Sequence, residues 1–128
     1  MRCLIDTHAL IWWWLDDMRL SPTIRAMMID PAHDVHVSSV CGWEIANKVR
    51  IGKLPQMAEQ VHRYDALVAD DGMIHLAIRH DHALRAGLLP GAQRDPFDRM
   101  IAAQALIEGL TVISRDPAFA AFGCDAIW

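Results

Sequence analysis

Short apolar runs that stop at polar residues alternate along this chain with longer segments of helical character. Four such runs are expected to form buried strands. They are Cys3–Ile5, Val35–Val37, Ile74–Ile78 and Leu110–Ile113. Strands that alternate with helices are typical of a mainly parallel sheet covered on both faces. The sequence therefore predicts an α/β fold whose functional groups gather at the carboxyl ends of its strands.

Six segments between these strands are expected to be helices. They are His8–Leu15, Pro22–Ile29, Val40–Ile51, Met57–Ala69, His80–Leu84 and Asp98–Glu108. Ser21 before Pro22 is a favourable helix start, and Gly109 is a favourable helix stop. The stretch Arg85–Phe97 contains two Gly and two Pro residues, and it is expected to be the longest loop and one wall of a site.

Length and composition indicate one folded domain that spans residues 1–128. No repeat, low-complexity tract or linker divides the chain, and a hydrophobic content of 53% excludes disorder as its default state. The longest unbroken apolar run, Ala9–Leu15, is far below the roughly 20 residues that span a bilayer. Asp6 falls where a signal peptide has its apolar stretch. We therefore expect a cytoplasmic protein without a membrane segment.

Charge and cysteine content narrow the function further. A net charge of −4 argues against a protein that coats nucleic acid through bulk electrostatics. This net charge is compatible with a nuclease, because divalent cations bound by clustered carboxylates make the local electrostatic potential positive. Three cysteines without C-x-x-C spacing indicate neither a disulfide framework nor a zinc site.

Four carboxylates are expected to converge at one edge of the predicted sheet. Asp6 and Asp116 follow the first and last predicted strands, so both lie at carboxyl ends. Glu44 lies in the helix after the second strand, and Asp98 begins the helix before the last strand. An oxygen-only set of this kind suits Mg²⁺ or Mn²⁺, which activate water and stabilise displacement at phosphorus.

Each acid also has a structural interpretation. Glu44 and Lys48 have the i, i+4 spacing of an ion pair on a helix. Asp95, before a proline, is a favourable helix cap. Asp6 and Asp116 stand in sequences that are typical of turns. For any single acid the structural role is the commoner one, and the joint occurrence of all four favours a site.

Several longer segments resemble the PIN domains of VapC-type toxins. They are Leu4–Trp13, Trp43–Lys48, Gly52–Leu54, Arg94–Ala105 and Leu110–Phe119. The resemblance covers essentially the whole chain in the family's order and spacing. It implies a PIN-like α/β/α sandwich and a Mg²⁺- or Mn²⁺-dependent endoribonuclease that cleaves RNA phosphodiester bonds. It also implies the toxin component of a toxin–antitoxin pair, a cognate VapB-like antitoxin and a homodimer.

The resemblance assigns roles by position. The acidic residues that match the family's catalytic and metal site are Asp6, Glu44, Asp98 and Asp116. Polar residues that match positions beside the metal are Thr7, Asp95 and Ser114. The cations expected to contact RNA are Arg94, Arg99, Arg115 and Lys48. Cys41 and Gln93 replace a Ser and a His that are common in relatives, and both changes leave the acidic set intact.

Two other functions fit parts of this sequence pattern. Phosphatases of the haloacid-dehalogenase type also open with a strand that ends in Asp, but they need a second acid where this chain has His8.

The alternative to an enzyme is a non-catalytic interaction module with an acidic metal-binding edge. In that case the run Trp12–Trp14 forms the interface. These three residues cover more than half of a helix circumference, so at least one is expected to be exposed or covered by a partner, and their helix is the candidate contact for an antitoxin or a second copy.

Overall fold

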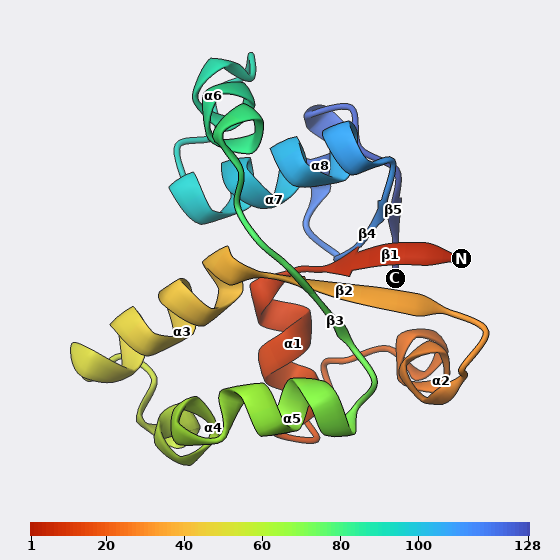
Figure 1. The fold of residues 1–128 in the computed structure, drawn as a ribbon, viewed down its shortest axis with the longest axis vertical. Coiled ribbons are helices and arrows are strands. Elements are labelled where there is room, and N and C mark those ends of the chain that lie inside the picture. Colours follow the sequence, from red (N-terminus) through yellow and green to blue (C-terminus); the bar gives the residue numbers. More distant parts are fainter.

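A five-stranded parallel sheet forms the centre of the molecule (Figure 1). The computed structural model describes all residues, 1–128. The strands are β1 (Arg2–Ile5), β2 (Asp34–Ser38), β3 (Ile74–Leu76), β4 (Thr111–Ile113) and β5 (Ala126–Ile127). Their order is β3-β2-β1-β4-β5, and every neighbouring pair is parallel. The predicted α/β fold is therefore confirmed, and the sheet is parallel throughout.

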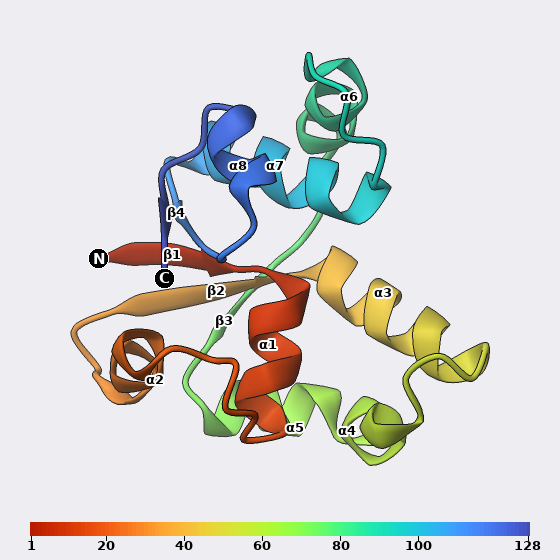
Figure 2. The same ribbon diagram turned by 180° about the vertical axis from the view of Figure 1, so that it is seen from behind.

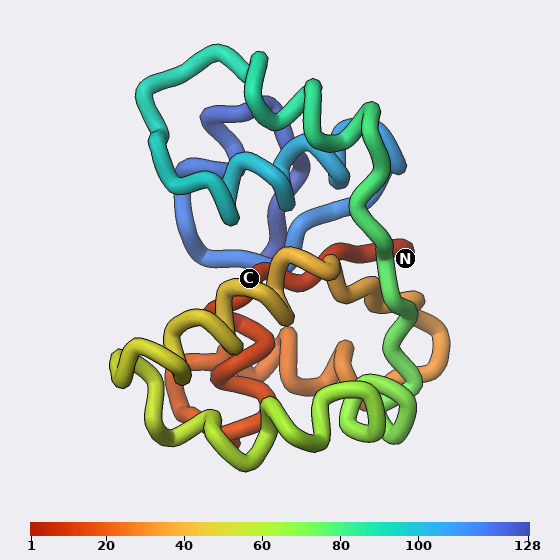
Figure 3. Tube along the Cα trace, turned by 60° about the vertical axis from the view of Figure 1, so that its left-hand side comes forward, coloured from red at the N-terminus to blue at the C-terminus, as the bar shows by residue number.

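Eight helices cover the two faces of this sheet. They are α1 (Thr7–Trp14), α2 (Pro22–Ile29), α3 (Ser39–Arg50), α4 (Ala58–His62), α5 (Tyr64–Asp70), α6 (His80–Leu88), α7 (Pro96–Glu108) and α8 (Pro117–Ala121). Figures 1 and 2 show α1 to α5 on one face and α6 to α8 on the other. The chain path in Figure 3 gives the same division. None of these helices is long and apolar enough to cross a membrane.

Side-chain caps decide where most of these helices begin. Asp6, Ser21, Ser38, Asp95 and Asp116 accept hydrogen bonds from the first backbone N–H groups of α1, α2, α3, α7 and α8. The predicted helix start at Ser21 is confirmed. Gly109 ends α7 with a φ of 66°, a left-handed conformation that favours glycine, so the predicted stop is also confirmed.

The face of α7 that packs on the sheet is small and apolar. Ile101 and Ala102 are fully buried, and Ala105 is almost so. These residues share the side of α7 on which Asp98 lies, because they follow it at helical spacing. Close packing of this face against the sheet therefore carries Asp98 to the sheet's edge.

Three predicted elements differ from the structure. The single helix predicted over Met57–Ala69 is instead a 3-10 turn followed by α4 and α5, which are separated at the non-helical Arg63. The helix predicted to stop at Leu84 extends to Leu88, which shortens the predicted loop to residues 89–95. Leu88 is exposed, so the last turn of α6 does not continue the pattern of buried apolar residues from which the helix was predicted. The short elements α8 and β5 were not predicted.

Of the three tryptophans of α1, one is buried in the core and its two neighbours are partly exposed, and a contact of this helix with a partner stays a prediction. Trp12 is only 6% exposed, and Trp13 and Trp14 are half-buried. The indole N–H groups of Trp13 and Trp14 both donate to Oδ2 of Asp71, at 2.9 and 2.8 Å. One carboxylate thus ties α1 to the end of α5.

Replacing Asp71 with Ala is expected to lower the free energy of unfolding by about 1–3 kcal/mol, because two half-buried donors lose their acceptor. Urea denaturation measures this loss. Asp70→Ala is the matched control, since Asp70 is exposed and its carboxylate has no hydrogen-bond partner. Equal losses in the two variants would show that the Asp71 bonds contribute nothing.

Candidate functional site

The acids of the predicted site converge at the carboxyl edge of the sheet's centre. Asp6 follows β1 and Asp116 lies beyond β4, and these neighbouring strands pair Ile5 with Ile113 at their ends. Glu44 lies in α3, which begins directly after β2, the other neighbour of β1. In Figure 1, α1, α3 and α7 all begin beyond the same ends of β1 and β2.

Helix capping fixes three carboxylates at this edge. Oδ1 of Asp6 accepts from the Ala9 N–H at 2.7 Å, and Oδ1 of Asp116 accepts from the Ala118 N–H at 2.9 Å. Asp95 caps α7 in the same way, which places Asp98 in the first turn. Asp6, Asp95 and Asp116 therefore do have structural roles, as helix caps. They also fix the positions of the acids, because each cap binds its carboxylate to a helix start at the sheet edge.

The pKa of Asp98 shows that the acids interact. Burial is the largest cause that raises this pKa, which reaches about 7. The smaller contributions come from the negative charges of Asp95, Asp116, Glu44 and Asp6. Burial also raises the pKa of Asp6, although hydrogen bonds from the Ser114 hydroxyl and the Ala9 N–H oppose this. The carboxylates at this edge therefore repel one another, and a bound cation would relieve the repulsion.

Glu44 is held by an ion pair. Its side chain is 3% exposed, and its Oε2 lies 2.5 Å from Nζ of Lys48. As they stand, no three His, Cys, Asp or Glu side chains lie close enough together to hold a metal ion. The acids thus lie at one edge of the sheet, but their side chains are not arranged as a complete set of metal ligands.

Lys48→Met is expected to destabilise the metal-free protein by about 1–3 kcal/mol, because it leaves the buried Glu44 charge without its partner. Thermal unfolding in EDTA measures the loss. Mn²⁺ is expected to restore part of it by supplying another positive charge. Lys53→Met is the control, because the Lys53 ammonium has no ion-pair partner. A Lys48 variant as stable as this control would contradict a role for the pair.

The polar residues predicted beside the metal have different positions. Ser114 is buried, and its hydroxyl accepts from the Asp116 N–H at 3.0 Å while it bonds to Asp6, so it connects two acids. Thr7 instead donates to Sγ of Cys41 at 3.5 Å, below the acids. Burial, and the nearby charges of the acids, raise the pKa of the Cys41 thiol to about 12, so this residue stays neutral.

The four cations predicted to contact RNA are not equally available. Arg94 and Arg115 are exposed, and Lys48 is engaged by Glu44. Arg99 donates to the backbone carbonyls of Ala86 and Gln93, at 2.9 and 2.8 Å. It also donates to the carbonyl of Gly87 in the last turn of α6 and to the carbonyl of Leu89 in the loop before α7. The Arg99 guanidinium therefore anchors that loop, and it is not free to bind a phosphate.

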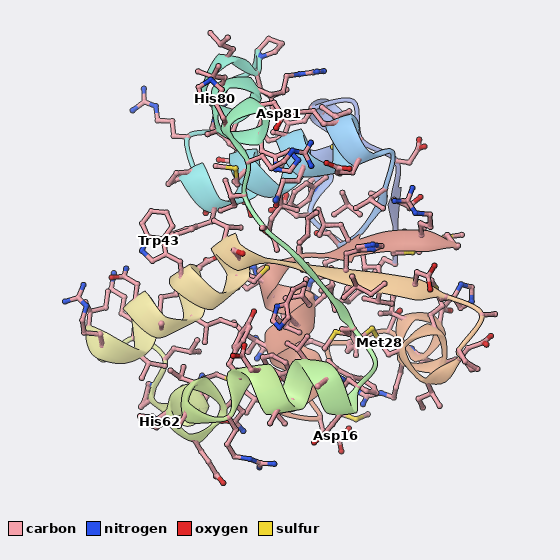
Figure 4. The ribbon with its side chains drawn as sticks, in the orientation of Figure 1. Asp16, Met28, Trp43, His62, His80 and Asp81 are labelled. Carbon is pink, nitrogen blue, oxygen red and sulfur yellow. The ribbon has the colours of Figure 1, made fainter.

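The structure adds two groups of residues to this region that sequence reasoning did not select. Trp43 is 61% exposed and packs edge-on against Phe97, with ring centroids 4.9 Å apart. Figure 4 shows it projecting from α3 toward the start of α7. Its position directly before Glu44 was the available signal. His8 and Arg19 line a hollow of about 450 Å³ beside the acids, and no spacing in the sequence links Arg19 to them.

Comparisons with known proteins agree with this geometry. The family model described as PIN domain matches residues 3–123. No curated protein matches the chain in sequence. Among solved structures, VapBC2 from Rickettsia felis bound to a promoter DNA fragment superposes with a TM-score of 0.74 at 13% identity, covering 99% of this chain and 98% of the other.

Two further structures give similar values. FitAcB from Neisseria gonorrhoeae has a TM-score of 0.69 at 20% identity and covers 100% of this chain and 97% of the other. A toxin–antitoxin complex from Klebsiella pneumoniae has a TM-score of 0.68 at 19% identity and covers 98% and 96%. At these identities the likeness shows the fold. Together with the family match, it confirms the resemblance found in the sequence: the chain belongs to the PIN domain family and has the fold seen in VapBC-type complexes.

Proposed function

We propose that this protein is a divalent-metal-dependent endoribonuclease and the toxin of a toxin–antitoxin pair. PIN domains are generally nucleases. The observation that carries the proposal is the convergence of acids from four elements at one sheet edge, expressed in the raised pKa of Asp98. Helix capping explains Asp6, Asp95 and Asp116 one at a time, but it does not require four other carboxylates to act on the half-buried Asp98.

The acids present fit Mg²⁺ or Mn²⁺. Both ions choose carboxylate oxygens, and the mutual repulsion at this edge is relieved by a positive charge. The residues that would hold the ion are Asp6, Glu44, Asp98 and Asp116. A bound divalent ion lowers the pKa of an attacking water and polarises the scissile phosphate.

The protein's own residues then have distinct tasks. The caps hold Asp6 and Asp116 in place, so these carboxylates need little reorganisation to face a ligand. Ser114 connects the two and limits their relative movement. Lys48 lies within reach of Glu44, so its ammonium is close to the site and can turn to a phosphate oxygen once another cation neutralises that carboxylate. One carboxylate orients the attacking water or accepts its proton.

The proposed partners are RNA, an antitoxin of VapB type and a second copy of the chain. Support for the antitoxin comes from the similar structures, whose names include VapBC2 and a toxin–antitoxin complex. We also propose that residues 1–128 form one domain that acts in the cytoplasm. Because the tryptophans of α1 are bonded internally, the exposed Trp43 replaces them as the aromatic residue best placed for a contact.

Cleavage of total cellular RNA by the purified, antitoxin-free protein tests this proposal. We expect discrete fragments with Mg²⁺ or Mn²⁺ and intact RNA with EDTA. Fragments that persist in EDTA would exclude a metal-dependent reaction. Intact RNA in every lane, from folded protein whose melting temperature responds to the metal, would instead favour the non-catalytic module with an acidic metal-binding edge.

A further inference from the structure

A groove leads away from the acids along α1. Its first part is the hollow of about 450 Å³ that Asp6 and Asp116 border. A second hollow of about 330 Å³ extends toward the end of α3 and the segment after it. His8, Trp12 and Arg19 line both hollows, so the two form one groove that starts at the candidate site.

The charge of this groove is opposite to that of the whole chain. Arg19, Lys48 and Lys53 line the second hollow together with His8, and no acid lines it. Arg19 and Arg115 line the first hollow opposite its two acids. Glu44 pairs with Lys48 and Asp17 pairs with Arg19, so Lys53 and Arg115 are the cations of this groove that no ion pair neutralises. In a chain with a net charge of −4, they give the groove a local positive charge that leads to the carboxylates.

Trp12 holds two of these cations in place. The guanidinium carbons of Arg115 and Arg19 lie over its ring, 4.5 and 5.0 Å from the ring centroid. Asp17 accepts from Nε and Nη2 of Arg19, at 3.0 and 2.7 Å, which leaves Nη1 free. Arg115 is exposed and has no acidic partner within ion-pair distance. Contact with the Trp12 ring restricts both side chains, which lowers the entropic cost of binding a ligand.

On the basis of the proposed ribonuclease function, we propose that this groove binds the sugar–phosphate backbone of the RNA strand. Arg115 and Arg19 contact phosphates close to the scissile bond, and Lys53 contacts the strand farther along. Guanidinium groups suit this role because they present several donors to phosphate oxygens. Trp12 is 6% exposed and offers no face to a base, so the groove sets affinity and register and leaves sequence choice to other residues.

Salt dependence of RNA binding tests this proposal. The inactive Asp6→Asn protein is titrated into a fluorescein-labelled single-stranded RNA of mixed sequence, at constant Mg²⁺ and a series of KCl concentrations. Each lost phosphate contact lowers the slope of log K against log salt by about 0.7 for a single strand. We expect this loss for Arg19→Ala and for Arg115→Ala, and about twice this loss for the double variant.

Two comparisons make the result specific. Arg115→Lys keeps the charge and is expected to keep the slope. Arg2→Ala removes an exposed arginine from the opposite end of β1 and is expected to change nothing. Thermal unfolding followed by far-ultraviolet circular dichroism checks that each variant keeps the wild-type fold.

The outcomes separate this proposal from the proposed function. If the wild-type protein cleaves RNA but the Arg19 and Arg115 variants keep the full salt slope, the proposal that the groove binds RNA is wrong. The proposed ribonuclease function would then still stand. A slope that falls equally for Arg2→Ala would also overturn the groove proposal, because net charge alone would then explain binding. Wild-type protein that neither binds nor cleaves RNA would overturn both.

Discussion

Asp6→Asn is expected to reduce RNA cleavage by more than about a hundredfold while the fold is retained. Loss of residues that merely orient metal ligands typically costs 10- to 100-fold, and Asp6 is proposed as a ligand itself. Asn has nearly the same shape as Asp, and its carbonyl oxygen can still accept from the Ala9 N–H, so the cap of α1 survives. Initial rates of cleavage at saturating Mn²⁺ measure the effect.

The stability of this variant separates catalysis from structure. Burial raises the pKa of Asp6, so its charge is unfavourable in the metal-free fold, and the Asn variant is expected to melt at or above the wild-type temperature in EDTA. Asp34→Asn is the matched control, because Asp34 is exposed at the opposite end of the neighbouring strand. An Asp6 variant that is unfolded in EDTA, or one that cleaves as fast as the control, would contradict this assignment.

Much of the fold followed from local patterns in the sequence. The helix starting at Pro22 and the stop at Gly109 depend on caps that are legible in a few residues. The alternation of strands and helices predicted a parallel sheet, but it did not give the strand order, which the structure shows to be β3-β2-β1-β4-β5. The break at Arg63 and the two-residue β5 have no signal in the local sequence pattern.

The site was predictable in position but not in detail. Asp6 and Asp116 were placed correctly because parallel strands end at the same edge. The roles of Arg99 and Arg19 were not predictable, because both depend on the path of loops. Arg99 stands beside the acids in sequence yet bonds to a loop, whereas Arg19 is remote in sequence and lines the hollow beside the acids. Sequence proximity therefore suggested Arg99 for the site and gave no reason to consider Arg19, whose position only the tertiary structure shows.

The raised pKa of Asp98 predicts how pH affects the metal-free protein. The folded-state pKa is about 7 against an unfolded value of 3.8, so between these values the folded state retains a proton that the unfolded chain has released. Stability in EDTA is therefore expected to fall as pH rises from about 4 to about 7. Asp98→Asn is expected to remove this part of the fall, which differential scanning calorimetry at a series of pH values would show.

A divalent ion is expected to reverse this dependence. Metal ligands must be deprotonated, so protons compete with the ion below the pKa of Asp98. Mn²⁺ is therefore expected to raise the melting temperature more at about pH 8 than at about pH 5. Because histidines titrate in the same window, the comparison with Asp98→Asn isolates the carboxylate. If the variant and the wild type respond identically to pH and to Mn²⁺, Asp98 neither titrates in this range nor binds the ion. The acidic edge would then need another explanation.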